Sequence, residues 1–314
     1  MIIRWLSRGG VRMTLTLALM ALIVLWVGPV SIWSTIKTSR PLPLLLSLLF
    51  TPGVIGIKTL RWLLLARTQG HISFSEALCS YLAGLALATL TPMAAGEAGR
   101  GLFVRTGDRA RLTGIVLLDK MVDLSTVSTF AGLGLILTEE PVAQIIGTAI
   151  FASVIVAGSA MLFLLPKLER LVTGAKTGKL THFRVVAIVG GLIDVPLPQL
   201  VLNVGLSLAG FIVFYGQAYV LLLSFWPAVP WTVITYFPII TLSTILPIAI
   251  GGVGIREWTA IILLRQFGVA ESVAFNTFFV HFVVVQLLPA LAGMAIIGVS
   301  GDWADDLPGK RRVR

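Results

Sequence analysis

The chain has 314 residues, of which 57% are hydrophobic and only 12% are charged. Soluble domains carry about 25% charged residues, so this composition and a mean hydropathy of +0.96 exclude an ordinary soluble enzyme and a disordered chain. The net charge of +10 does not indicate nucleic-acid binding, because the basic residues border apolar runs instead of forming a soluble basic surface. Apolar runs of about 18 residues or more predict an all-α polytopic integral membrane protein.

Residues that form disulfides or bind metals are scarce. Cys79 is the one cysteine, and His71, His182 and His281 lie far apart in the sequence. We therefore expect no disulfide within the chain, no metal site and no cofactor.

The first apolar run, 14–33, follows Arg4, Arg8 and Arg12 and is long enough to cross a bilayer. A cleaved signal peptide is the alternative. The run is longer than a typical signal-peptide core, however, and no small-residue cleavage site follows it cleanly. We therefore expect a retained first span.

The remaining membrane elements are predicted from apolar segments, which in chain order are 42–66, 77–92, 112–137, 142–165, 198–226, 231–249 and 272–299. The stretch 166–197 mixes charged and apolar residues and has prolines near its end. It predicts a cytoplasmic linker with an amphipathic part.

The distribution of Lys and Arg predicts the topology. If 77–105 and 232–267 are re-entrant helical hairpins, about six full spans remain, with sixteen basic residues on the cytoplasmic side and three outside. Eight full spans would also place both termini in the cytoplasm, but would put Arg105, Arg109 and Arg111 outside, against the positive-inside bias. We therefore predict a multi-pass protein of the cytoplasmic (inner) membrane with six full spans, two re-entrant hairpins and both termini cytoplasmic.

Two of the apolar segments are interrupted by matching sequences. The first interruption contains Pro92, Gly96, Glu97 and Arg100, and the second contains Pro247, Gly251, Gly252, Gly254, Arg256 and Glu257. In both, a Thr stands three residues before the proline and a Gly stands four after it. The prolines are 155 positions apart, and the same offset relates the flanking spans. This pattern predicts one transmembrane domain, 1–314, built as an inverted repeat with copies at about 42–165 and 197–299.

The interruptions predict a binding site. Non-helical backbone at membrane depth persists only where it is buried in protein or lines a polar cavity. A helix that restarts after Gly96 or Gly254 points its amides toward that cavity, and Arg100 and Arg256 lie nearby, so we expect a shared anion or phosphate site. For either motif alone, the alternative is that Pro and Gly are simply tolerated and the charges merely pair.

Further ionisable residues lie within predicted spans. Asp119 and Asp123 are four residues apart, so they share one helical face, and Lys120 lies beside them. Charges at this depth usually face a partner or a water-filled path, although snorkelling from the cytoplasmic end is an alternative. The candidate partners are Arg100, or Arg61 and Lys58 on the second span.

His281 on the last span, with Asn276 and Gln286, is the polar counterpart in the second half of the chain. We include His281 among the candidate binding residues, although a lone membrane histidine is more often a structural hydrogen-bonding group.

These motifs resemble a known family. Pro92-x-x-x-Gly96-Glu97-x-x-Arg100, Leu117-Leu118-Asp119-Lys120-x-x-Asp123 and Pro247-x-x-x-Gly251-Gly252-x-Gly254-x-Arg256-Glu257 are similar to the transmembrane, flippase-type domain of lysylphosphatidylglycerol synthases. The resemblance runs over roughly residues 10–300. It implies membrane helices with re-entrant elements and a role in moving lipids or lipid-linked molecules between leaflets. Bifunctional members carry a soluble aminoacyltransferase domain after the membrane region, so we expect here a stand-alone member that is not an enzyme.

The residues and the resemblance together predict a protein that translocates an anionic or phosphate-bearing lipid, or a polyprenyl-phosphate-linked molecule, between leaflets. Two other function classes stay open: an ion-coupled transporter of a small solute, and a non-transporting membrane partner of a separate glycosyl- or aminoacyltransferase. Membrane lipids are the expected partners, and a homodimer also stays open.

Overall fold

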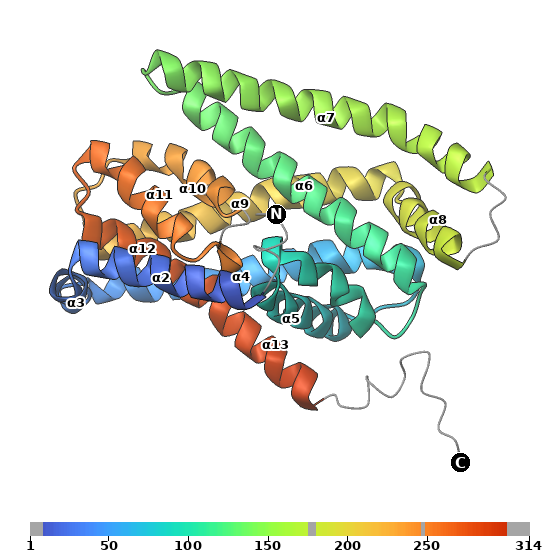
Figure 1. The fold of residues 1–314 in the computed structure, drawn as a ribbon, viewed down its shortest axis with the longest axis horizontal. Helices are drawn as coiled ribbons and strands as arrows, with labels where there is room; N and C mark the ends of the chain where they lie inside the picture. The colour runs from blue at the N-terminus through green and yellow to red at the C-terminus, as the bar shows by residue number, and fades with distance from the viewer. Residues whose placement is uncertain (1–8, 175–179, 246–248, 300–314) are drawn as a thin grey trace.

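The computed structural model describes residues 9–174, 180–245 and 249–299, and the regular structure in these ranges is helical (Figure 1). The longest helices are α4 (Pro41–Ala66), α6 (Arg109–Ile136), α7 (Pro141–Gly174) and α9 (Leu197–Phe225). α4 packs along α9, and α6 packs against α7. The chain is therefore all-helical, as predicted.

The predicted first span, 14–33, is not one straight helix. α2 (Gly9–Val27) and α3 (Pro29–Lys37) meet at an angle of 75°. Gly28 between them has a φ of 89°, which glycine adopts without strain, and Pro29 suits the first turn of a helix because it lacks an N–H. The Gly28-Pro29 pair therefore sets the bend.

The two interrupted segments are broken into short helical pieces. In the first, α5 (Phe74–Leu90) is followed by η2 (Pro92–Phe103), a run of 3₁₀ turns that packs back against α5. The second comprises η3 (Trp231–Tyr236), α10 (Phe237–Ser243), η4 (Ile250–Gly252) and α11 (Ile255–Leu264). Pro247 lies outside the described residues.

The predicted linker 166–197 is mostly helical. α7 extends to Gly174, beyond the predicted span end at 165, and α8 (Leu180–Ile193) packs against α6. Gly114 on α6 allows this close packing, because a Cβ there would lie 2.1 Å from the carbonyl oxygen of Ile188. α8 is thus a packed element of the bundle.

The last predicted span, 272–299, is one apolar stretch built from three pieces: α12 (Glu271–Phe282), the π-helical turns of η6 (Val283–Leu287) and α13 (Leu288–Val299). Pro289 has no N–H to donate to the preceding turn, and a wider π turn is a common way for a helix to accommodate such a break. Two short 3₁₀ turns, η1 (Arg67–Gln69) and η5 (Arg265–Phe267), complete the described elements.

Four helical stretches in the described ranges are long and apolar enough to cross a bilayer: Pro41–Gln69, Pro141–Met161, Leu197–Phe225 and Glu271–Gly298. The bent pair of α2 and α3 makes a fifth if it is one span. α6 is as long as these helices, but three charged residues, Asp119, Lys120 and Asp123, interrupt its apolar sequence. The chain is therefore a multi-pass membrane protein whose most polar long helix lies inside the bundle.

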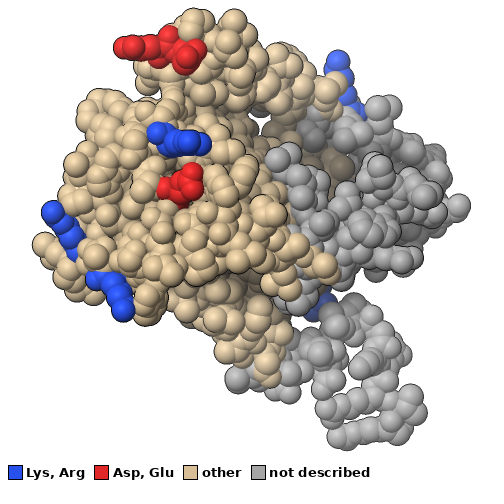
Figure 2. All heavy atoms as spheres, turned by 60° about the vertical axis from the view of Figure 1, so that its left-hand side comes forward, with Lys and Arg blue, Asp and Glu red and all other residues tan. Residues whose placement is uncertain are grey.

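The surface and the packing fit a lipid environment. On the face shown in Figure 2, most of the surface is uncharged and charged side chains are few. The exposed large apolar side chains of the molecule include Leu25, Val30 and Leu42. Helices approach closely at glycines, as membrane helices commonly do. A Cβ on Gly132 of α6 would lie 2.9 Å from the carbonyl oxygen of Gly147 on α7.

Candidate functional site: a buried charge network

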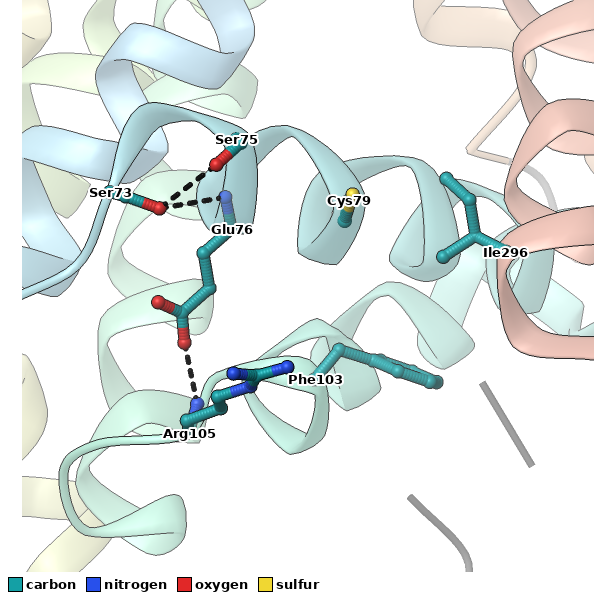
Figure 3. A pocket seen from close by; sticks show the side chains of 7 residues that line it. All are labelled: Ser73, Ser75, Glu76, Cys79, Phe103, Arg105 and Ile296. Carbon is teal, nitrogen blue, oxygen red and sulfur yellow. Dashed lines mark hydrogen bonds between the residues drawn. The ribbon is translucent and has the colours of Figure 1, made fainter. Parts of the chain in front are cut away.

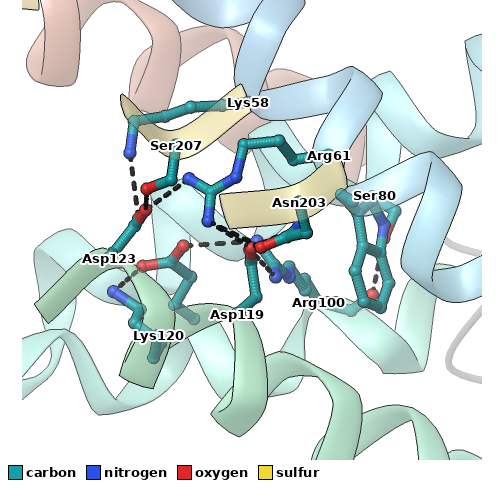
Figure 4. A network of polar contacts seen from close by, with 11 residues as sticks. Lys58, Arg61, Ser80, Arg100, Asp119, Lys120, Asp123, Asn203 and Ser207 are labelled. Carbon is teal, nitrogen blue, oxygen red and sulfur yellow. Dashed lines mark hydrogen bonds and ion pairs between the residues drawn. The ribbon is translucent and has the colours of Figure 1, made fainter. Parts of the chain in front are cut away.

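Seven charged side chains from three helical segments form one connected cluster, which we call the charge network (Figure 4). Its members are Lys58 and Arg61 on α4, Glu97 and Arg100 on η2, and Asp119, Lys120 and Asp123 on α6. The partners predicted for the two aspartates were Arg100, or Arg61 and Lys58. In the structure, all three pair with these aspartates.

Arg100 is the most deeply buried charged residue of the network, with 1% of its surface exposed. Its Nη2 donates to Asp119 Oδ2 at 2.6 Å and its Nη1 donates to Glu97 Oε1 at 3.4 Å. The guanidinium also lies over the ring of Trp62, 4.3 Å from the centroid, where the ring face attracts a cation. Arg100 is therefore held on three sides.

The local sequence explains how η2 places Arg100. Thr91 Oγ1 donates to the carbonyl of Leu87 at 2.9 Å and accepts the N–H of Gly96 at 2.6 Å, which closes the turn between α5 and η2. Gly96 must lack a side chain, because a Cβ there would lie 2.3 Å from the carbonyl oxygen of Leu87. Gly84 on α5 likewise makes room for Arg100, whose Cβ would lie 2.5 Å from a Cβ at position 84.

A chain of hydrogen bonds fixes the backbone at Arg100. The indole N–H of Trp62 donates to Ser80 Oγ at 3.1 Å, and Ser80 Oγ donates to the carbonyl oxygen of Arg100 at 2.7 Å. α4, α5 and η2 are thereby joined by polar contacts inside an apolar bundle.

Arg61 bridges the two aspartates of α6. Its Nη2 donates to Asp119 Oδ1 at 2.7 Å, and its Nη1 donates to Asp123 Oδ1. The (i, i+4) spacing of the aspartates places both carboxylates on the helix face that meets α4. The predicted shared face is therefore the face that binds arginine.

The neighbouring helix α9 completes this part of the network with neutral groups. Asn203 Nδ2 donates to Asp119 Oδ1 at 3.2 Å, and Ser207 Oγ donates to Asp123 Oδ1 at 3.0 Å. Neither Asn203 nor Ser207 was a predicted site residue. Two polar residues four apart in an otherwise apolar span share one face, and that spacing was the available signal.

One edge of the network, which we call the lysine rim, is partly exposed. Lys58 Nζ lies 3.2 Å from Asp123 Oδ2, and Lys120 Nζ pairs with Glu97 Oε2. The exposed fractions of the lysine side chains are 27% and 38%, whereas that of the Arg61 side chain is 3%. Lys58 and Lys120 are therefore the most exposed cations of the network.

The second interrupted segment forms a smaller polar site. Glu257 is fully buried, and its Oε2 accepts the N–H of Gly254 at 2.6 Å, so it caps the start of α11. Its Oε1 accepts from Arg256 at 2.8 and 3.2 Å. The Arg256 guanidinium lies 4.6 Å from the centroid of the Phe282 ring. The charged groups of Arg256 and Glu257 therefore interact mainly with each other.

The glycines of this segment turn the chain between α10 and α11. Gly251, Gly252 and Gly254 have φ values of 62°, 71° and 89°, a region that other residues rarely adopt. η4 packs against both η2 and α5. The two interrupted segments are thus neighbours in space, although they are half a chain apart in sequence.

The match to a family model decides the family. Residues 13–293 match the model described as the lysylphosphatidylglycerol synthase TM region, which covers nearly the whole chain. The chain belongs to this family. A search of curated proteins found no match.

Within this family member, the predicted site residues fall into two groups. Glu97, Arg100, Asp119 and Asp123 lie together in the charge network, and Gly251, Gly252, Gly254, Arg256 and Glu257 lie together at the start of α11. Arg100 and Arg256 each bind a glutamate of their own motif. A phosphate that bound both arginines would have to displace these carboxylates, so the shared phosphate site stays a prediction.

His281 lies apart from the charge network. Its ring packs against Phe214 with centroids 4.5 Å apart, and 3% of the residue is exposed. Its neighbour Asn276 donates to the carbonyl oxygen of Ile32 at 3.0 Å and so joins α12 to α3. These contacts indicate packing and helix association.

A cavity of about 330 Å³ lies where α5 begins and η2 ends (Figure 3). Its lining residues, none of which was a predicted site residue, are Ser73, Ser75, Glu76, Cys79, Phe103, Arg105 and Ile296. Glu76 Oε1 accepts the backbone N–H of Arg105 at 2.7 Å across this cavity. Among the described residues, no three His, Cys, Asp or Glu side chains gather in a group that would hold a metal ion.

Proposed function

We propose that this protein moves an anionic or phosphate-bearing lipid, or a lipid-linked molecule, between the leaflets of the cytoplasmic membrane. The observation that carries the proposal is the charge network, which lies between helices of an apolar membrane bundle. Charged side chains inside a membrane are costly, and they mark substrate or ion paths more often than structural contacts.

The arrangement of the network supports transport over a purely structural role. A buried ion pair is weak evidence for stability, because apolar residues of similar volume often serve as well. Here the network also has a partly exposed edge, the lysine rim, through which a charged group gains access. Transport of a charged headgroup requires such access.

The proposed mechanism uses the two interrupted segments as re-entrant hairpins of an inverted repeat, with six full spans and both termini cytoplasmic. Each half places broken pieces between two long helical stretches: α5 and η2 between α4 and α6, and α10, η4 and α11 between α9 and α12–α13. The contact between η2 and η4 supports a site near their junction. Rocking of one half against the other would open this site to either leaflet.

In this mechanism, Arg100 and Arg256 bind the phosphate in a conformation in which it replaces one carboxylate partner. Arginine suits this role because its planar guanidinium binds phosphate through two parallel hydrogen bonds. Glu97 and Glu257 hold the arginines when no lipid is bound.

Leaflet exchange in proteoliposomes tests the proposal. The purified protein is reconstituted with acyl-labelled phospholipid, and exchange is measured by adding a membrane-impermeant quencher. We expect exchange with the wild type and with Arg109→Ala, and a loss of about tenfold or more with Asp123→Asn, which removes a carboxylate bound by Lys58 and Arg61. Empty liposomes serve as the baseline.

The same vesicles separate the alternatives. An ion-coupled transporter of a small solute would leave lipid exchange at the empty-liposome rate while accumulating a soluble substrate. A non-transporting partner of a transferase would leave both lipid exchange and solute accumulation at the level of empty liposomes. Lipid exchange at the empty-liposome rate with correctly inserted wild-type protein would remove the proposal.

A further inference from the structure

The carboxylates of the charge network are already paired with donors. Each of the six oxygens of Glu97, Asp119 and Asp123 already accepts a hydrogen bond or ion pair from Lys58, Arg61, Arg100, Lys120, Asn203 or Ser207. Every carboxylate oxygen of the network is therefore already bound to a donor of the network.

The donors of the network are not exhausted. Arg61 Nε and Arg100 Nε are buried and have no hydrogen-bond partner. An ammonium group has three N–H donors, and Lys58 Nζ and Lys120 Nζ each pair with a single carboxylate oxygen. The network thus has more donors than acceptors.

The charges show the same imbalance. Lys58, Arg61, Arg100 and Lys120 are four cations, whereas Glu97, Asp119 and Asp123 are three anions. Arginine does not lose its proton in proteins, and lysine is ordinarily a cation at neutral pH. One positive charge in the described part of the network therefore has no counter-charge.

The lysine rim is where this charge meets the surroundings. Figure 4 shows the ammonium groups of Lys58 and Lys120 on the same side of the network, with the Asp123 carboxylate between them. Lys58 also lies 5.2 Å from the centroid of the Phe211 ring, which adds an apolar wall. A group that carries acceptor oxygens and one negative charge would complete both the hydrogen bonding and the charge balance.

We propose that the lysine rim binds the phosphodiester of a phospholipid whose headgroup carries one net negative charge. The inference rests on the proposed function for its choice of a lipid as the source of the phosphodiester. A zwitterionic headgroup leaves the excess charge unbalanced, because its cationic group cancels its phosphate. A diphosphate brings more negative charge than the network can neutralise. The lysine rim therefore favours a headgroup with one net negative charge over a zwitterionic headgroup or a diphosphate.

Binding to the full-length protein in detergent tests the inference without requiring transport. The midpoint of thermal unfolding is measured against increasing concentrations of three probes: dioctanoyl phosphatidylglycerol, dioctanoyl phosphatidylcholine and dimethyl phosphate. The first carries one net negative charge, the second carries none, and the third is a soluble phosphodiester. Binding to the folded state adds RT ln(1 + [L]/Kd) to the free energy of unfolding, so a tighter ligand raises the midpoint at a lower concentration.

We expect phosphatidylglycerol to bind the wild type at least tenfold more tightly than phosphatidylcholine. Lys58→Gln and Lys120→Gln should each weaken phosphatidylglycerol binding about tenfold, the order expected when a hydrogen bond to a charged group is lost. Lys120→Arg keeps the charge and should retain most of the binding even if the glutamine variants fold poorly. Lys37→Gln, on α3 outside the network, is the matched control.

Three results would overturn the inference: equal binding of the two lipids, unchanged binding in both glutamine variants, or dimethyl phosphate binding as tightly as phosphatidylglycerol. The last result would assign the site to a free anion. Selective binding without leaflet exchange would reject the proposed function and keep the charge-selective site. Leaflet exchange without selective binding would keep the proposed function and reject the charge-selective site.

Discussion

The two interrupted segments have matching sequences but different surroundings. Around η2, charged side chains from α4 and α6 join Glu97 and Arg100 in a network of seven charges. Around α11, Arg256 and Glu257 pair with each other beside Phe282, next to a largely aromatic and aliphatic core. The first segment shares its charges with neighbouring helices, and the second does not.

The difference lies in the helices that flank each segment. At the offset of 155 that relates the two motifs, Asp119 corresponds to Ala274 and Asp123 corresponds to Phe278, both of which belong to the apolar core. At the same offset, Arg61 corresponds to Gly216. The offset thus repeats the proline and glycine of the turn, and each segment carries a glutamate–arginine pair near them, while the surrounding chemistry is specific to one half.

Asp119→Asn should have the largest effect on stability. Asp119 accepts hydrogen bonds from both Arg61 and Arg100, so the change removes one carboxylate from each of two buried guanidinium groups. Breaking a buried ion pair costs about 3–5 kcal/mol, and we expect a loss of that order in the free energy of unfolding, measured by thermal unfolding in detergent. Glu257→Gln removes the carboxylate from one arginine and should cost less. Equal losses would show that the two regions are energetically equivalent.

Arg100→Ala and Arg256→Ala should each slow lipid exchange about ten- to a hundredfold if both arginines bind one phosphate. That range follows from about 1.5–3 kcal/mol for a hydrogen bond to a charged group. Arg100→Lys should also be damaging, because a point charge does not reproduce two parallel hydrogen bonds. The double variant should fall short of the combined effect of the single variants, since residues that act on one ligand are coupled.

This prediction needs a control at equal protein incorporation. Arg109→Ala, at the half-buried start of α6 outside the charge network, should exchange lipid at the wild-type rate. Wild-type exchange in both single arginine variants would remove the shared phosphate site. A defect in Arg100→Ala alone would confine the function to the charge network.

Gly84→Ala should have an intermediate effect that involves no change in charge. The added methyl group would lie 2.5 Å from Arg100 Cβ, so η2 must move away from α5. Overpacking of this kind costs typically about 1–3 kcal/mol, and we expect a lower unfolding midpoint together with slower exchange. Gly205→Ala on α9 is the matched control, because no atom lies within 4 Å of a Cβ there. A stable Gly84→Ala variant with normal exchange would mean that the position of Arg100 is not critical.

Much of the fold was predictable because hydrophobic runs define membrane helices directly. The predicted span 42–66 corresponds to α4, and the span 198–226 corresponds to α9, within one residue at each end. The bend at Gly28 and the helix α8 were not predicted. Both depend on tertiary packing and on local backbone geometry, which an apolar run does not specify.

The site was predictable only in part, for a related reason. The spacing of Asp119 and Asp123 indicated a shared face, and the list of candidate partners contained Arg61, because charges inside a membrane must meet one another. Asn203 and Ser207 were missed because neutral polar residues are common in membrane helices. Arg100 was also predicted as a partner of the aspartates, but the sequence could not show that it would bind Asp119 together with Arg61, because this depends on how η2 packs against α5 and α6.

Cysteine labelling at the two ends of α6 should change stability least and tests how the two halves are oriented. α6 has 28 residues, so at about 1.5 Å per residue it is roughly 42 Å long, enough to cross a bilayer. In a Cys79→Ser background, Thr106→Cys should react only with reagent admitted to the cytoplasm, and Glu140→Cys should react only from outside. Both positions are exposed, so we expect each change to stay within about 0.5 kcal/mol of the parent protein. Thr106 is preferable to Gly107, whose φ of 94° would strain a cysteine.

The reversed labelling pattern would support eight full spans, with the hairpins crossing the membrane. Labelling of both positions from one side would mean that α6 does not cross, and the charge network would then not lie at membrane depth.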